Sequence, residues 1–304
     1  MVLSLSAAVS WGTSSILLKV VLETESPLDS LIIRGLFAVP FVALITLLIN
    51  QFASVMVLFS LKIFPILVVS SMCVTFGDLI FFFALQRIEV SKALPVASIY
   101  PLFAAILLTL GGLEELTLMT ASGTIVIIVG VGLVAQKANS SEQTAQKQGF
   151  LDIGIVLAII AAVFWSFGIL TLRIMFEDPQ VETFSLATIR FAILTIFAVF
   201  LWVGIFLYEK RAPPRSQPLA ATEITKKNIV TLGVSGILSW GIGGVAFFQA
   251  MQLIGASRAT PISSINPLVG SLLGFIFLKE RIGKLQIVGI LLVTMGSIII
   301  SLGQ

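Results

Sequence analysis

The stretch "SKALPVASIYPL" at residues 91–102 returns as "SRATPISSINPL" at residues 257–268, 166 positions later. Seven of the twelve positions are identical, whereas ordinary residue frequencies would give about one identity by chance. Further pairs at this offset are Phe81 and Phe247, Phe82 and Phe248, Glu114 and Glu280, Gly123 and Gly289, and Gly130 and Gly296. At a slightly smaller offset, "AAVSW" (7–11) returns as "AAVFW" (161–165), so the first half of the chain is repeated in the second.

The composition is that of a membrane protein. Of 304 residues, 58% are hydrophobic and 11% are charged, whereas soluble domains are about 25% charged. There is too little polar surface here to cover a water-soluble globule. The net charge of +3 is not gathered into a basic block, which argues against a nucleic-acid partner. The chain has no histidine, which excludes HExxH zinc sites and Ser-His pairs, and we expect neither a metal nor a cofactor.

Ten apolar runs are long enough to cross a membrane as helices, which takes about 20 residues each. They lie near 2–22, 28–49, 62–85, 91–112, 117–135, 150–174, 182–208, 229–253, 257–278 and 283–302. We therefore expect an all-α, multi-pass integral membrane protein, surrounded by lipid and typical of a prokaryotic plasma membrane. Its parts are a first five-helix repeat at 1–136, a polar linker loop at 137–149 and a second five-helix repeat at 150–304.

An odd number of spans in each repeat has a consequence for orientation. A five-span unit ends on the opposite side of the membrane from its start, so the second copy is inserted upside down. Inverted repeats of this kind are common in secondary transporters, where two halves move about a central site. Gene duplication without a transport role is the alternative. The sequence thus predicts a central cavity lined mainly by spans one, three, four, six, eight and nine.

The chain resembles the EamA family of the drug/metabolite transporter superfamily. The resemblance rests on the five-plus-five organisation, the repeated "P…S-I-x-P-L" phrase, the "LKER" at 278–281 and the glycine-spaced fifth and tenth spans. It implies ten helices around a central cavity and the export or uptake of small solutes. Family members handle amino acids, nucleotide sugars, cofactors and other metabolites, so the resemblance implies no particular substrate.

The prolines of the repeated phrase point to interrupted helices. Proline inside a helix frees the carbonyl four residues earlier, and a membrane tolerates such a group only where protein or a water-filled cavity satisfies it. Kinks that serve packing alone are the alternative. We predict helix breaks at Pro95, Pro101, Pro261 and Pro267, with Ser98, Tyr100, Ser264 and Asn266 beside them in the substrate cavity.

Several other polar or aromatic residues lie deep in apolar runs. Trp11, Trp165 and Trp240 are too far inside their spans for interfacial anchors, and they fit cavity walls or core packing. Gln249 faces either the cavity or a neighbouring helix. The glycines of spans five and ten fit either a dimer interface or packing within one chain, which leaves monomer and homodimer both open.

Three charged residues that lie well inside their spans stand out. Arg34 and Arg190 hold matching places in spans two and seven and fit snorkelling, charge pairing or anion binding. Asp78 lies in span three, where its repeat partner is Gly244. An intramembrane carboxylate without a repeat counterpart suggests a specific role, either accepting a coupling proton or meeting a substrate cation. A salt bridge to a nearby cation is the alternative.

These features favour a secondary transporter that moves a small metabolite, such as an amino acid, by alternating access, with a coupling proton. A facilitative exchanger or uniporter for a phosphorylated or nucleotide-linked metabolite is the alternative. A channel is disfavoured because no selectivity filter or ring of like charges is present. An intramembrane aspartyl protease is disfavoured because "TFGD" (75–78) supplies one membrane carboxylate and the chemistry needs two. We therefore expect no enzymatic activity.

The orientation of the termini stays open. Lys and Arg gather in the first, third, fifth, seventh and ninth loops, which places both termini outside by the positive-inside rule. The family resemblance implies cytoplasmic termini instead.

Overall fold

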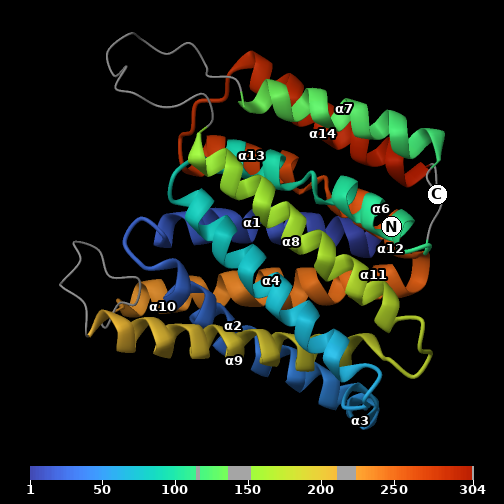
Figure 1. The fold of residues 1–304 in the computed structure, drawn as a ribbon. Coiled ribbons are helices and arrows are strands. Elements are labelled where there is room, and N and C mark those ends of the chain that lie inside the picture. Colours follow the sequence, from blue (N-terminus) through green and yellow to red (C-terminus); the bar gives the residue numbers. More distant parts are fainter. Residues whose placement is uncertain (114–116, 136–151, 211–223, 303–304) are drawn as a thin grey trace.

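The computed structural model describes residues 1–113, 117–135, 152–210 and 224–302, and the regular structure in these ranges is all helical (Figure 1). The linker predicted at 137–149 lies outside them, as does Glu114. The elements are α1 (Val2–Val21), α2 (Pro27–Leu48), η1 (Phe52–Ser54), α3 (Val55–Leu58), α4 (Phe64–Leu85), α5 (Val90–Ala97), α6 (Tyr100–Leu110), α7 (Leu118–Ala135), α8 (Ile153–Met175), α9 (Thr183–Glu209), α10 (Lys226–Gly236), η2 (Ile237–Gly244), α11 (Val245–Ile254), α12 (Ala256–Ser263), α13 (Asn266–Phe277) and α14 (Lys284–Leu302).

The helices begin where the sequence supplies capping groups. The Ser26 hydroxyl accepts a hydrogen bond from the Asp29 backbone N–H at 3.1 Å, and Pro27 follows at the first position of α2. Asp152 caps α8 in the same way, accepting from the backbone N–H of Gly154 at 2.9 Å. These side chains satisfy N–H groups that have no partner inside the helix.

The outer helix faces are apolar. Leu48, Phe200 and Phe277 are 75%, 70% and 68% exposed, which is typical of lipid-facing side chains. Within the described residues, seven helical segments are long and apolar enough to cross a membrane, and shorter apolar helices lie at 121–134, Asn266–Phe277 and Lys284–Ile300. The predicted all-α architecture with several candidate membrane spans is therefore confirmed.

The helices α7 and α14 pack together at one edge of the molecule (Figure 1). A Cβ atom on Gly123 would lie 2.6 Å from the carbonyl oxygen of Gly296, and one on Gly130 would lie 2.8 Å from that of Gly289. The two backbones approach closely because none of these residues has a side chain. The glycines thus serve packing within the chain, one of the two interpretations that the sequence left open.

Each copy of the repeated phrase interrupts its helix at the same place. The turn Ser98–Ile99 separates α5 from α6, and the turn Ser264–Ile265 separates α12 from α13. The backbone N–H of Ser98 donates to Leu94 at 2.8 Å, and its equivalent at Ser264 donates to Thr260 at 3.1 Å. The second prolines, Pro101 and Pro267, stand at the start of α6 and α13. The sequence analysis predicted breaks at Pro95 and Pro261 as well, whereas α5 and α12 continue past these two prolines.

The predicted eighth span consists of three consecutive helical segments. Its middle turn, η2, is a π-helix flanked by α10 and α11. The wider π turn is rare in proteins as a whole, and where it occurs it is often at a functional site. The sequence analysis predicted one regular helix here.

Candidate functional site

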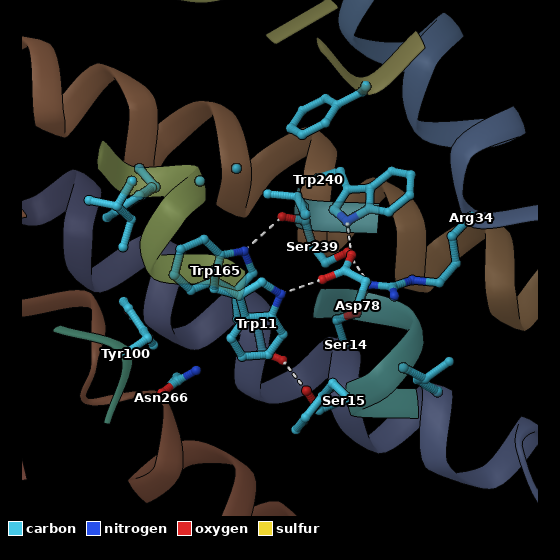
Figure 2. Close-up of a pocket in the computed structure, with 18 of the residues that line it drawn as sticks. Trp11, Ser14, Ser15, Arg34, Asp78, Tyr100, Trp165, Ser239, Trp240 and Asn266 are labelled. Atoms are coloured by element: carbon cyan, nitrogen blue, oxygen red, sulfur yellow. Dashed lines mark hydrogen bonds between the residues drawn. The ribbon is translucent and has the colours of Figure 1, made fainter. Parts of the chain in front are cut away.

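A cavity of about 160 Å³ lies at the centre of the helices (Figure 2). An apolar cavity of about 150 Å³ is large enough to hold a benzene molecule, so this one has room for a small organic solute. Its lining comes from α1, α2, α4, α5, α6, α8, α9, η2, α11 and α13. The second and seventh predicted spans (α2 and α9) therefore contribute as well as the six that the sequence analysis named.

Two tryptophans wall the cavity in matching ways. A Cβ on Gly77 would lie 2.7 Å from the Trp165 ring, and one on Gly243 would lie 2.8 Å from the Trp11 ring. The two glycines are 166 positions apart. The rings also pack on phenylalanines at the same offset. The ring centroids of Phe81 and Trp165 are 5.1 Å apart, and those of Phe247 and Trp11 are 5.2 Å apart.

Asp78 is buried beside the cavity and is held by two indole groups (Figure 2). Trp165 Nε1 donates to Asp78 Oδ1 at 2.8 Å, and Trp240 Nε1 donates to Oδ2 at 3.2 Å. The third cavity tryptophan, Trp11, donates instead to the carbonyl oxygen of Ser239 in the π-helix at 2.9 Å. One carboxylate thus fixes two of the three cavity tryptophans.

Both predicted arginines line the cavity and are almost fully buried. Arg34 donates to the hydroxyls of Ser14, at 3.4 Å, and Ser239. Arg190 donates to the carbonyl oxygen of Gly168 at 3.3 Å. Within the described part of the chain, neither arginine lies within ion-pair distance of Asp78.

The two helix breaks meet beside the cavity. Ser98 Oγ donates to Asn266 Oδ1 at 2.7 Å. Tyr100 OH and Ser263 Oγ are hydrogen-bonded at 2.8 Å. Tyr100 and Asn266, which occupy equivalent repeat positions, both line the cavity. Each break is therefore tied to the other through a side chain.

The cavity brings together most of the residues that the sequence analysis selected. Trp11, Arg34, Asp78, Tyr100, Trp165, Arg190, Trp240 and Asn266 line it. Three residues predicted for the cavity do not line it. Ser98 is hydrogen-bonded to the lining residue Asn266, and Ser264 donates to the Thr260 carbonyl oxygen of the preceding helix at 3.0 Å. Gln249 is half-buried outside the lining.

Several lining residues were not predicted. Four of the phenylalanines were recognised as repeat pairs but not placed in the site, and Phe191 was not selected at all. The serines carry no signal in a sequence of uniformly apolar helices, because such helices do not indicate which face is buried. These residues are Ser14, Ser15, Ser239, Phe81, Phe82, Phe191, Phe247 and Phe248.

Glu280 joins the second half of the chain to the first. Its Oε1 and Oε2 atoms accept from the backbone N–H groups of Val90 at 2.8 Å and Ser91 at 2.9 Å. A carboxylate at the start of α5 is favourable because the N-terminal N–H groups are unpaired and the helix dipole is positive there. Glu280 is buried and caps the N-terminus of α5, the first segment of an interrupted helix.

A methyl group at Gly77 or Gly243 is expected to displace the adjacent tryptophan. Gly77→Ala and Gly243→Ala should each lower the free energy of unfolding by about 1–3 kcal/mol, the usual effect of overpacking, and shift the tryptophan emission. Thermal unfolding and intrinsic fluorescence measure the two effects. Gly132→Ala in α7 is the matched control, because a Cβ there has no neighbour within 4 Å. Equal behaviour of all three variants would contradict the assigned contact.

The fold and cavity define a helical membrane protein with a solute-sized internal site, and comparisons with known proteins agree. The model of the EamA-like transporter family matches residues 1–136 and 152–302, and the chain belongs to this family. It is similar to an uncharacterized transporter of Archaeoglobus fulgidus, with 27% identity over 99% of this chain and 97% of that protein. A Lactobacillus helveticus protein, whose name assigns it provisionally to sugar uptake, is 24% identical over 98% of each chain.

The fold also occurs among solved structures. One crystal structure superposes with a TM-score of 0.68 over 98% of this chain and 94% of that one, at 13% sequence identity. Family membership and the apolar helices together establish a multi-pass integral membrane protein and a membrane transporter.

Proposed function

We propose that the protein is a secondary transporter with ten membrane-spanning helices in two inverted halves, which open the central cavity to either side in turn. The observation that carries the proposal is the exchange of contacts between repeat-equivalent residues. The Trp11 ring of the first half packs on Gly243 of the second, and the Trp165 ring of the second packs on Gly77 of the first. Such reciprocity is expected of two halves related by a pseudo-two-fold axis.

The directions of the helices support the inversion. In Figure 1, α1 runs from right to left and its repeat equivalent α8 runs from left to right. The contacts of Gly123 with Gly296 and of Gly130 with Gly289 require α7 and α14 to be antiparallel. Equivalent helices that cross in opposite directions give a central site equivalent access from both sides.

The cavity size favours a small metabolite, an amino acid or similar solute. A volume of about 160 Å³ is close to that of a cavity that holds benzene. The alternative, exchange or facilitated movement of a nucleotide-linked metabolite, would need a wider cavity. Asp78 is the group we propose for the coupling proton, because it is the buried carboxylate of the cavity lining and intramembrane carboxylates commonly carry protons.

Side chains at the helix breaks provide the test of this site. Purified protein in proteoliposomes is screened with labelled amino acids and metabolites, with and without a pH gradient. Asn266→Ala leaves the Ser98 hydroxyl without its acceptor, and Tyr100→Ala removes the bond to Ser263. Each variant should reduce uptake about tenfold, as expected for a lost buried hydrogen bond.

The matched control is Ser297→Ala, because the buried Ser297 hydroxyl donates to the Val293 carbonyl oxygen within α14 at 3.0 Å and lies off the cavity lining. It should transport like the unmodified protein. Unchanged uptake in both Asn266→Ala and Tyr100→Ala, with normal folding, would remove the helix breaks from the solute site.

A further inference from the structure

The two cavity arginines occupy equivalent places but have different surroundings. The Arg34 guanidinium lies 5.0 Å from the centroid of the Phe82 ring, and that of Arg190 lies 5.1 Å from the centroid of Phe248. The two phenylalanines are 166 positions apart. The shared geometry places each cation on an aromatic face, so the remaining neighbours decide what each cation does.

Arg34 is compensated by its surroundings. Its guanidinium donates to the hydroxyls of Ser14 and Ser239 and lies 5.4 Å from the Trp240 ring. Figure 2 shows the Arg34 side chain pointing toward Asp78 and Ser239. Arg34 therefore has two hydroxyl acceptors and two aromatic neighbours, and its side chain is directed toward Asp78.

Arg190 lacks these partners because the repeat differs at each of them. Around Arg34 lie two serine hydroxyls, one indole and one carboxylate. The repeat-equivalent positions around Arg190 carry residues that lack these groups. The pairs are Ser14 and Gly168, Ser239 and Cys73, Trp240 and Val74, and Asp78 and Gly244. Arg190 is 3% exposed, and its Nε, like that of Arg34, finds no hydrogen-bond partner among the described residues. Within the described residues, the one hydrogen bond of the Arg190 guanidinium goes to the Gly168 carbonyl oxygen.

We propose that Arg190 binds a carboxylate of the transported solute, whereas Arg34 holds Asp78 and the cavity wall. This inference rests on the proposed transport function. A buried cation is costly without an opposite charge and hydrogen-bond acceptors. A guanidinium presents paired N–H donors that match the two oxygens of a carboxylate. A bound carboxylate would supply the negative charge and the side-chain acceptors that are missing at Gly244 and Gly168.

The charged and aromatic residues that line the cavity indicate which class of solute it can bind. With Asp78 ionised, the two arginines and one aspartate among the described lining residues leave an excess of one positive charge. A single carboxylate neutralises that charge, whereas a phosphate monoester carries nearly two negative charges at neutral pH. The rings of Trp11, Trp165 and Phe81 line the same space and suit an apolar or flat body. The class is therefore a small monocarboxylate with an apolar body, with or without an amino group.

Tryptophan fluorescence offers a direct binding test, because three of the chain's four tryptophans line the cavity. The purified protein is titrated with phenylacetate and its uncharged amide, phenylacetamide, and then with phenylalanine, phenethylamine, phenyl phosphate and glucose. Phenylacetate and phenylalanine should bind at least about tenfold more tightly than the amide and the amine, because the latter lack the charged acceptor.

The arginine variants connect this preference to one residue. Arg190→Gln should weaken carboxylate binding about 10- to 100-fold, the range for a hydrogen bond to a charged group. Arg190→Lys should recover part of the affinity, because it keeps the charge but loses the paired donors. Arg173→Gln replaces a half-buried α8 arginine that is paired with Glu177 at 3.4 Å. It lies off the cavity lining, is the matched control and should bind like the unmodified protein.

Three outcomes would overturn the inference. They are equal binding of phenylacetate and its amide by the unmodified protein, binding of no carboxylate in the panel, and carboxylate affinities in Arg190→Lys and Arg190→Gln that match the control. The first two do not depend on the folding of a variant. Glucose binding that is independent of Arg190 would refute the carboxylate site and leave the transport function standing.

Discussion

Asp78→Asn is expected to abolish solute accumulation driven by a pH gradient while solute exchange continues. The substitution keeps the size of the side chain and removes its ability to carry a proton. At one proton per solute, a pH difference of about one unit is worth ~1.4 kcal/mol and supports about tenfold accumulation. The variant should therefore equilibrate the solute without concentrating it, as measured with labelled solute in proteoliposomes.

The same variant should disturb the tryptophans in a defined way. The Asp78 carboxylate accepts Nε1–H bonds from Trp165 on one oxygen and from Trp240 on the other. Asparagine has one acceptor oxygen, and its NH₂ group can only donate. One indole therefore loses its acceptor, and the emission spectrum should change even where exchange persists.

Asp29→Asn is the matched control for the Asp78 variant. Asp29 also accepts an indole N–H, from Trp202 at 2.6 Å, but it lies at the start of α2, away from the cavity lining. It should retain gradient-driven accumulation. Normal accumulation in Asp78→Asn would leave Asp78 as a partner of Arg34 and the tryptophans, without a role in coupling.

Much of the fold could be predicted from the sequence because long apolar runs have few alternatives in a membrane. The helices begin and end within a few residues of the predicted runs, as α1 at Val2–Val21 and α9 at Thr183–Glu209 illustrate. The repeated phrase located the interruptions because proline has a local and unavoidable effect on helix hydrogen bonds.

The contacts that shape the cavity could be predicted only in part. Trp11, Asp78 and Arg190 were selected because each is unusual at its depth in an apolar span. The pairing of Arg34 with Ser14 and Ser239 was missed, because apolar residues surround these helices on every side and no periodic pattern indicates the inner face. The π-helix that carries Ser239 and Trp240 was also missed, because it packs against α1 and α2, which are distant in sequence.

The contact between Glu280 and the first turn of α5 also could not be predicted from the sequence. Glu280 lies near the end of a predicted span, where a contact with a neighbouring cation is the simplest local expectation. The structure directs it to the first turn of α5 instead, 189 and 190 positions away along the chain. A sequence indicates that such a carboxylate needs donors, and the fold decides which donors are available.

The central claim is that the cavity opens to both sides of the membrane, and thiol labelling of Ser15→Cys tests it most directly. Ser15 lines the cavity, is 7% exposed and donates to the Trp11 carbonyl oxygen of its own helix at 2.9 Å, so cysteine is a small change. Cys73, the one native cysteine, is replaced by serine. A membrane-impermeant thiol reagent is added to sealed vesicles of each orientation. The account predicts labelling of Cys at position 15 from either side, without any knowledge of the solute, and labelling from one side alone under all conditions would contradict it.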